Sequence, residues 1–204
     1  MYTPSINKMT DKNKILEFIS AYSFGTIITA KVELPVATHL PFLVSQKDDS
    51  IILSSHFAKA NPHWHDIEKR QVLVIFSEPH AYISPSYYEK QLNVPTWNYI
   101  SVHLYGQCSI IKEAQDSISI LEKTIDRYEE AYKDQWNDLP EEYKSAMIQG
   151  IVAFRINVTH IEAKEKLSQN KTAHEQLNII SGLSQSNDTN SQQIAQYMKL
   201  NLKK

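Results

Sequence analysis

Residues Val94–Gly106, VPTWNYISVHLYG, carry the clearest structural signal in the chain, because as a β-strand they separate two unlike sets of side chains. Successive side chains of a strand point to opposite faces. One face takes the aromatic and polar residues Trp97, Tyr99, Ser101, His103 and Tyr105. The other takes Asn98, Ile100, Val102 and Leu104, which after the first position is the pattern of a core wall. The polar and aromatic face suits a flat ligand rich in heteroatoms; a barrel strand with Tyr and Trp at its surface is the alternative.

Shorter β-forming runs with turn signals between them lie on both sides of this strand. They start at Gly25, Val36, Ser50, Gln71, Ala81 and Ile151, and the runs 36–45 and 50–56 are joined by a turn over 46–49. Helices are expected over 12–22, 63–69, 113–132, 140–147, 172–180 and 191–202. Short strands without regular intervening helices favour a mainly β, α+β chain built on an antiparallel barrel over a doubly wound sheet.

Composition and charge exclude several classes of protein. The 204 residues hold 21 Lys and Arg against 23 Asp and Glu, so no global positive field attracts nucleic acid. The four glycines are too scattered for a Rossmann or P-loop nucleotide site. The single cysteine, Cys108, permits no intramolecular disulfide, and neither a signal peptide nor a membrane span is apparent. We expect a cytoplasmic protein that is not in a membrane.

The run from Ser54 to Pro62, SSHFAKANP, is a candidate phosphate site without glycines. Asn61 and Pro62 signal the start of a helix, where unpaired N–H groups favour an anion. Lys59 adds a cation, and Ser54 and Ser55 add hydroxyl donors. The alternative is an ordinary turn from strand to helix with a solvated lysine.

A second polar run, Lys164–Lys171, KEKLSQNK, ends the last expected strand with three cations and several hydrogen-bonding groups. Lysine pairs with anions, while the amides of Gln and Asn donate and accept together, a mixture that suits a flavin ring. A solvated strand end is the alternative.

Eight histidines raise the possibility of a metal or haem site. His63 and His65 are two apart on an expected helix and do not share a face, so they form a poor metal pair. His39 and His103 lie on expected strands, where they could meet across the sheet. No ligand-spacing motif supports a metal, and no G-x-S-x-G elbow supports a nucleophile, so we expect neither.

Five ordered motifs together resemble the PaiB-type FMN-binding negative transcriptional regulators. They are ATHLPF from Ala37, HFAKANPHW from His56, HAYISPSYY from His80, the 94–106 strand, and KLSQN from Lys166. The resemblance implies an FMN-binding split β-barrel, related to pyridoxamine phosphate oxidase and flavin reductases and usually a homodimer. We expect the barrel domain over residues 1–170, with a helical insertion at about 113–148, and a C-terminal helical arm over 171–204.

The resemblance also assigns roles to residues of this chain. The FMN phosphate would lie on the 54–61 segment, and the ring would lie between residues of two other segments. The implied FMN-binding residues are Ser54, Ser55, His56, Lys59, Asn61, Trp97, Asn98, His103, Lys166, Ser168 and Gln169. Lys59 stands where many similar sequences have arginine, which keeps the charge but loses the bidentate fork.

Three functions follow as hypotheses. The first is a regulator that represses sporulation or degradative-enzyme genes, although no DNA-reading motif is visible. Direct DNA binding would require a dimer to gather lysines 164, 166, 171, 199, 203 and 204 into one patch. The second is an FMN-dependent oxidoreductase or flavin reductase, with His103 or Tyr99 as proton donor. The third is a flavin- or haem-binding barrel without chemistry of its own.

Overall fold

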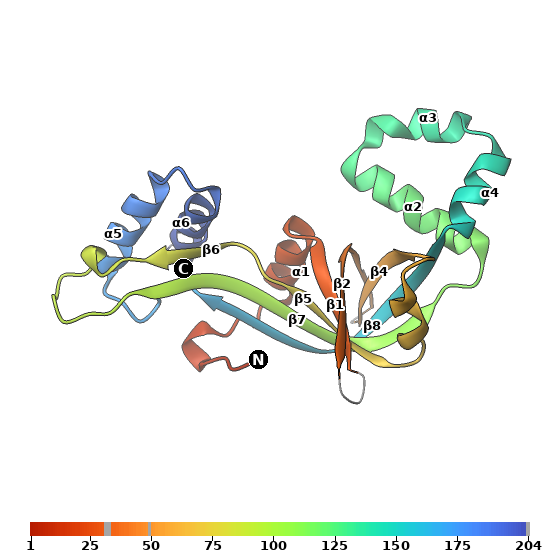
Figure 1. Ribbon diagram of the computed structural model, residues 1–204. Helices are drawn as coiled ribbons and strands as arrows, with labels where there is room; N and C mark the ends of the chain where they lie inside the picture. The colour runs from red at the N-terminus through yellow and green to blue at the C-terminus, as the bar shows by residue number, and fades with distance from the viewer. Residues whose placement is uncertain (31–33, 49, 203–204) are drawn as a thin grey trace. The chain divides into compact units, whose positions relative to one another are not determined.

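The computed structural model describes residues 1–30, 34–48 and 50–202 (Figure 1). Its strands are β1 Phe24–Ala30, β2 Pro35–Pro41, β3 Leu43–Lys47, β4 Ser50–Ala58, β5 Gln71–Phe76, β6 His80–Ile83, β7 Thr96–Ile110 and β8 Ile151–Lys166. Its helices are α1 Lys12–Ala21, α2 Ala114–Tyr128, α3 Lys133–Asp138, α4 Glu141–Gln149, α5 Ala173–Ser184 and α6 Thr189–Leu202. Within the described residues, no helix is both long enough and apolar enough to span a membrane.

The strands form one sheet in the order β2-β1-β5-β7-β8-β4-β3, with β6 paired to β7 off this path. The pairs β1–β2, β1–β5, β3–β4, β4–β8 and β6–β7 are antiparallel. The consecutive strands β1 and β2 pair with each other, as do β3 and β4, but β2 and β3 lie at opposite ends of the strand order, so these four strands do not form a continuous meander.

The chain divides into two compact units. The barrel unit comprises Phe18–Phe76 and Leu104–Ile161, and the terminal unit comprises Met1–Glu17, Ser77–His103 and Glu162–Lys204. Strands β7 and β8 each contribute one part to either unit. Helices α5 and α6 belong to the terminal unit, together with the N-terminal residues and β6. The sequence predicts a separate helical arm for this part of the chain, after residue 170.

The barrel unit is centred on four phenylalanines that are almost fully buried. Phe42 contacts Phe76 and Phe154 edge to face, with ring centroids 5.6 Å and 6.3 Å away, and Phe57 lies 4.9 Å from Phe154. Three of these rings come from β4, β5 and β8, and Phe42 lies between β2 and β3, so their burial holds the strands together. Gly25 lies against this core, because a Cβ at that position would be 2.7 Å from the Phe76 ring.

The two faces expected of residues 94–106 are present in β7. Asn98, Ile100, Val102 and Leu104 are all 0% exposed, whereas Trp97 is 53% exposed. Tyr99, His103 and Tyr105 are half-buried on the same side as Trp97. The strand therefore has a core face and a partly solvated aromatic face, as its alternation predicts.

The strand expected over 36–45 is wrong, because β2 ends at Pro41 and β3 begins at Leu43. Proline has no N–H to donate to a neighbouring strand, and Phe42 turns inward, where it is 1% exposed. The backbone N–H of Phe42 donates to the carbonyl of Ser23 over 2.8 Å instead of to a ladder partner. A break of one residue thus places a core phenylalanine between two strands.

Several helices differ in type or length from those that the sequence predicts. The helix expected over 63–69 is a 3-10 helix over Pro62–Asp66, and the expected 113–132 helix ends at Tyr128. Helix α3, in the segment KDQWND, was not expected at all. Helix α5 continues beyond residue 180 to Ser184 after a capping box formed by Thr172 and Glu175. Part of the 46–49 turn, Asp49, and lysines 203 and 204 lie outside the described residues.

Candidate functional site

Strand β4 presents Ser54 and His56 on one face and Ser55 on the other. Ser55 is 3% exposed and donates its hydroxyl proton to the Pro41 carbonyl over 2.6 Å. Ser54 and His56 are half-buried on the outer face, where burial lowers the pKa of His56. Of the two serines predicted to donate to a phosphate, only Ser54 therefore faces outward, and Ser55 supports the core.

The residues after β4 form a capped turn, as predicted. The side chain of Asn61 accepts a hydrogen bond from the His63 backbone N–H over 3.0 Å and lies 3.3 Å from the Thr38 hydroxyl. Lys59 has an exposed side chain, while its carbonyl accepts from the Trp64 indole over 2.9 Å. Since the helix that follows has only five residues, its dipole is weak. A phosphate on this segment would depend chiefly on the Lys59 charge.

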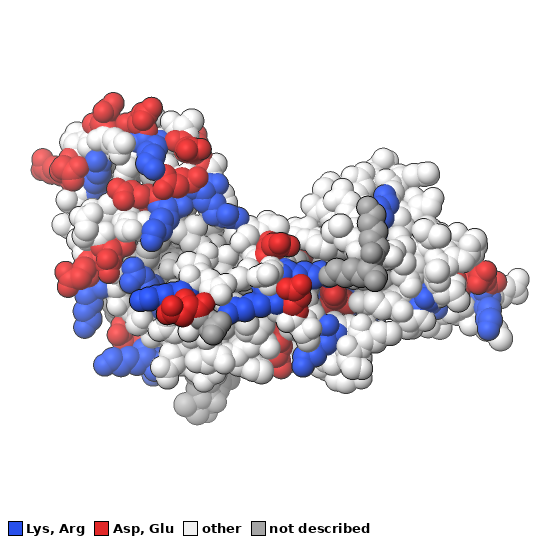
Figure 2. All heavy atoms as spheres, turned by 180° about the vertical axis from the view of Figure 1, so that it is seen from behind, with Lys and Arg blue, Asp and Glu red and all other residues white. Residues whose placement is uncertain are grey.

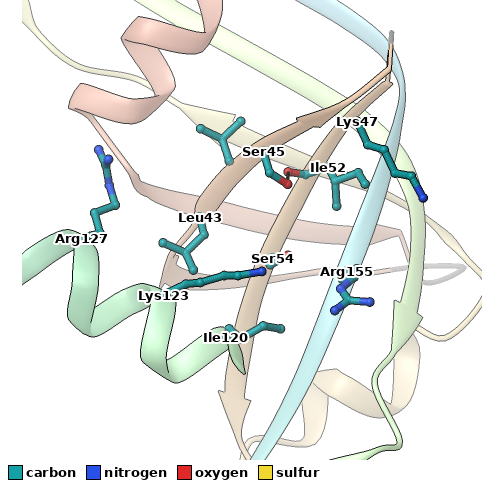
Figure 3. Close-up of a pocket in the computed structure, with 10 residues that line it drawn as sticks. Leu43, Ser45, Lys47, Ile52, Ser54, Ile120, Lys123, Arg127 and Arg155 are labelled. Carbon is teal, nitrogen blue, oxygen red and sulfur yellow. Dashed lines mark hydrogen bonds between the residues drawn. The ribbon is translucent and has the colours of Figure 1, made fainter. Parts of the chain in front are cut away.

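A cavity of about 530 Å³ lies beside this segment in the barrel unit (Figure 3). Its walls come from β3, β4, β8 and α2, and they combine cations and hydroxyls with apolar side chains. The lining residues are Leu43, Val44, Ser45, Lys47, Ile52, Ser54, Ile120, Lys123, Arg127 and Arg155. Figure 3 shows Lys123 extending from α2 toward Ser54, with Arg155 on β8 across β4. Ser54 is the one predicted site residue among them.

Local periodicity explains how these residues meet. Leu43, Ser45 and Lys47 alternate along β3 and therefore share a face. The strand register pairs Ser54 of β4 with Leu43 on one side and Arg155 on the other, which places all three on the same face of the sheet. On α2, positions 120, 123 and 127 follow helical spacing and form one stripe. The cavity lies between this stripe and that face.

The cavity is strongly positive. Four of its lining residues are cations and none is acidic. Arg155 has a carboxylate of Asp116 at 3.7 Å, and Arg127 donates to the Ser20 carbonyl. Among the described residues, Lys47 and Lys123 make no ion pair. Figure 2 shows many acidic side chains over α2–α4, with cations between them.

In the terminal unit, Asn98 and Ser168 form a buried hydrogen-bonded pair. The Asn98 amide donates to the Ser168 hydroxyl over 3.0 Å, and that hydroxyl lies 3.1 Å from Asn98 Oδ1. Ser168 holds a left-handed backbone conformation, with φ of 59°. Two predicted site residues are thus brought together, but Asn98 points to the core face, opposite Trp97 and His103. The alternation of the strand therefore places Asn98 on the opposite side of β7 from the other two residues predicted to lie near the ring.

Lys166 is fixed beside this pair. Its ammonium donates to the Trp97 carbonyl over 2.6 Å and also to the Thr96 hydroxyl. Burial, and then the nearby charge of Lys164, lower the pKa of Lys166. The amide of Gln169 is used within its own turn, because it accepts from the Leu167 N–H over 2.7 Å and donates to the Glu165 carbonyl over 2.5 Å. Lys166, Asn98 and Ser168 also line a hollow of about 210 Å³.

The aromatic face of β7 carries the imidazole of His103, which makes no hydrogen bond through Nδ1 to any of the described residues. The side chain of His103 is half-buried. Burial and the N-terminal ammonium lower the pKa of His103, while the Glu162 carboxylate, 4.0 Å from Nδ1, opposes the shift. Trp97 packs near His80 and Tyr82, with ring centroids 5.9 Å away in each case.

Other reactive side chains have structural roles. The imidazole of His63 is 2% exposed and bridges the hydroxyls of Thr29 and Thr38 at 2.9 Å and 2.8 Å. Cys108 is buried, and burial followed by the charge of Glu68 raises the pKa of its thiol to about 12. No cluster of metal-binding side chains occurs in the described part of the chain.

Comparisons with known proteins identify the family. The model of a family described as "Putative FMN-binding domain" matches residues 1–160. The chain is also 39% identical over 210 residues to "Protease synthase and sporulation protein PAI 2" of Bacillus subtilis, covering 100% of this chain and 99% of that protein. The chain belongs to the PaiB-type FMN-binding family. An uncharacterised yeast protein, YKL070W of Saccharomyces cerevisiae, is 35% identical over 101 residues, or 46% of this chain and 60% of that one.

Solved structures support the fold of this PaiB-type chain. The flavocytochrome Anf3 of Azotobacter vinelandii matches with a TM-score of 0.61 at 15% identity, over 77% of this chain and 68% of that one. The FAD and heme binding protein of Mycobacterium smegmatis matches with a TM-score of 0.60 at 14% identity, over 84% and 78%. At these identities the likeness concerns the fold, and the predicted antiparallel split barrel with flanking helices is confirmed.

Family membership gives FMN as the cofactor of this PaiB-type chain, and its residues are chemically suited to FMN. A phosphate needs cations and N–H or O–H donors, which the barrel unit offers at Ser54, Lys59 and the positive cavity. A flavin ring needs hydrogen-bond donors and flat surfaces, which the terminal unit offers at the Lys166 ammonium and the exposed Trp97. The cavity cations could not be found from sequence motifs, because they are distributed over three elements, β3, α2 and β8.

Proposed function

We propose that the chain is a cytoplasmic, homodimeric, FMN-binding transcriptional regulator of the PaiB type, acting as a repressor of sporulation or degradative-enzyme genes. The observation that carries this proposal is the 39% identity to PAI 2 along the whole of both chains.

We propose the FMN contacts in two groups. In the barrel unit Ser54, His56, Lys59 and Asn61 would face the phosphate, with Ser55 supporting them from the core side. In the terminal unit Trp97, His103 and Lys166 would face the ring, and the Asn98–Ser168 pair and Gln169 would hold the Lys166 turn in place. Bound FMN would supply a redox-active ring, while these residues bind and orient it.

Three of the six lysines proposed for direct DNA contact, Lys164, Lys166 and Lys171, are engaged within the chain. Lys164 is 7% exposed and lies 5.0 Å from the centre of the Tyr99 ring. Lys171 lies 3.7 Å from the centre of the Tyr88 ring and donates to Asn93. With Lys166 also engaged, a strong electrostatic contact with DNA is not favoured, and we propose that regulation acts mainly through a partner or through the flavin.

The regulatory proposal is tested by deleting the gene in its bacterial host and measuring transcripts. We expect transcripts of degradative-enzyme and sporulation genes to rise, and to fall again when the intact gene is restored. Unchanged transcripts would refute the proposal. Fluorescence anisotropy with DNA upstream of the affected genes, measured at several salt concentrations, separates the two routes, because direct binding would weaken steeply with salt.

An FMN-dependent oxidoreductase is the second candidate, and one observation favours it. The half-buried imidazole of His103 makes no hydrogen bond through Nδ1 to the described residues, and its lowered pKa favours the neutral form, which can accept a proton from a reacting group. The test is NADH or NADPH oxidation by the FMN-loaded protein, compared with His103→Asn. Turnover in the wild type that falls in the variant supports this function, and absence of turnover with common acceptors counts against it.

A further inference from the structure

The positive cavity of the barrel unit has a charge that its protein surroundings do not neutralise. Lys47, Lys123, Arg127 and Arg155 all line it, and the carboxylate of Asp116 is 3.7 Å from Arg155. Like charges around one hollow repel each other, so the arrangement is most favourable when an anion lies among them. We propose that this cavity binds a phosphate-bearing ligand.

The donors of the cavity, four cations and two serine hydroxyls, exceed what the two oxygens of a carboxylate can satisfy and suit a phosphate group, which accepts through three oxygens and carries more charge. Guanidinium groups bind phosphate oxygens in pairs, and lysines add compact positive charge. The register places Ser54 directly beside Arg155, so a hydroxyl and a guanidinium share one face. Lys123 extends toward Ser54 from the opposite wall (Figure 3). A phosphate at this point would meet donors from both the sheet and α2.

The rest of the cavity indicates what the phosphate is attached to. Its volume of about 530 Å³ is within the range of about 300–1,000 Å³ for small-molecule sites. Leu43, Ile52 and Ile120 supply apolar wall, which a free inorganic ion would leave uncovered. The ligand class is therefore a phosphate monoester with an apolar or aromatic body.

Two sources could supply such a monoester. One is FMN, since Ser54 belongs both to the cavity and to the segment proposed for the cofactor phosphate. In that case the inference rests on the proposed function, and the cavity cations are additional residues that bind the FMN phosphate. The other is a separate phosphorylated metabolite that acts as an effector. Both ligands require the same cations, so replacing these cations tests whether the cavity binds phosphate at all. Comparing FMN with other ligands then distinguishes the two sources.

The experiment compares Lys123→Gln and Arg155→Gln with a matched control, Lys112→Gln. Lys112 is exposed just before α2 and does not line the cavity, so its variant makes the same charge change elsewhere. FMN and riboflavin are titrated by calorimetry. Inorganic phosphate is tested as a probe of the anion site, by its effect on the melting temperature at constant ionic strength. Circular dichroism checks folding, and Lys123→Gln is decisive if Arg155→Gln fails to fold.

Each outcome has a defined meaning. If FMN is the ligand, both cavity variants weaken FMN binding about tenfold or more, while riboflavin binding and the control are unchanged. If a separate ligand binds, FMN affinity is unchanged and the cavity variants lose the stabilisation by phosphate. A wild type that takes up no FMN but shows that phosphate effect overturns the proposed function and retains the cavity site. Cavity variants that change neither FMN binding nor phosphate stabilisation overturn the inference.

Discussion

The buried pair of Asn98 and Ser168 gives a prediction whose size follows from the structure. Asn98 is 0% exposed and Ser168 is 5% exposed, and their side chains hydrogen-bond at 3.0 Å and 3.1 Å. Asn98→Ala removes these bonds and leaves a buried hydroxyl without a partner. An unsatisfied buried group costs about 1–3 kcal/mol and each lost bond about 0.5–1.5 kcal/mol, so we expect a loss of about 2–4 kcal/mol in the free energy of unfolding.

The assay is urea unfolding followed by circular dichroism for both single variants and the double variant. Asn98→Ala/Ser168→Ala should cost less than the sum of the single changes, by about 1–2 kcal/mol, because removing both partners leaves no orphaned group. Ser168→Gly should be less harmful than Ser168→Ala by about 1 kcal/mol, since glycine accepts the left-handed backbone at this position without strain. Additive single costs, or an Asn98→Ala variant as stable as the wild type, would refute the reasoning.

Three further predictions concern titration, reactivity and core polarity. The pKa of His103, measured by NMR, should lie below the ordinary histidine value, and lower still in Glu162→Gln, because the Glu162 carboxylate opposes the shift. Because the imidazole is protonated more readily in the unfolded state, His103 should reduce the stability of the fold as pH falls below about 6.5. Cys108, with its pKa raised to about 12, should react with a thiol reagent at pH 8 only after denaturation. His63→Leu should lower unfolding free energy by about 2–4 kcal/mol in urea, because it removes the His63 hydrogen bonds to Thr29 and Thr38 and leaves Thr38 only its contact with Asn61. An upward pKa shift, rapid native labelling, or an unchanged urea midpoint would contradict these in turn.

Strand alternation was the most reliable guide to the fold. In β7 the period of two correctly separated Ile100, Val102 and Leu104 from the partly solvated Tyr99. The pattern failed at Phe42, where an apolar run continued through a backbone break. Pro41 was the local signal for that break, since it cannot donate to a ladder. Local patterns therefore predict which face is buried better than where a strand ends.

The sequence predicted the candidate site only where its residues are adjacent in the chain. Ser54 to Asn61 and Lys166 to Gln169 are contiguous runs, so their chemistry is visible as motifs. The cavity cations Lys123 and Arg155 are 32 positions apart in the sequence. They line the same cavity only because α2 lies beside β4 and β8. Helical and strand periodicity predicts each half of that cavity, but the packing that joins the halves is a long-range property of the fold.

The direct test of the central claim is flavin binding by the purified chain. The protein should be isolated with FMN, identified by its absorbance and by mass spectrometry of the released cofactor, or should take up FMN stoichiometrically after its removal. Riboflavin, which lacks the phosphate, should bind more weakly because it cannot engage the cations of the barrel unit. A chain that is colourless as purified and does not bind added FMN would contradict the account.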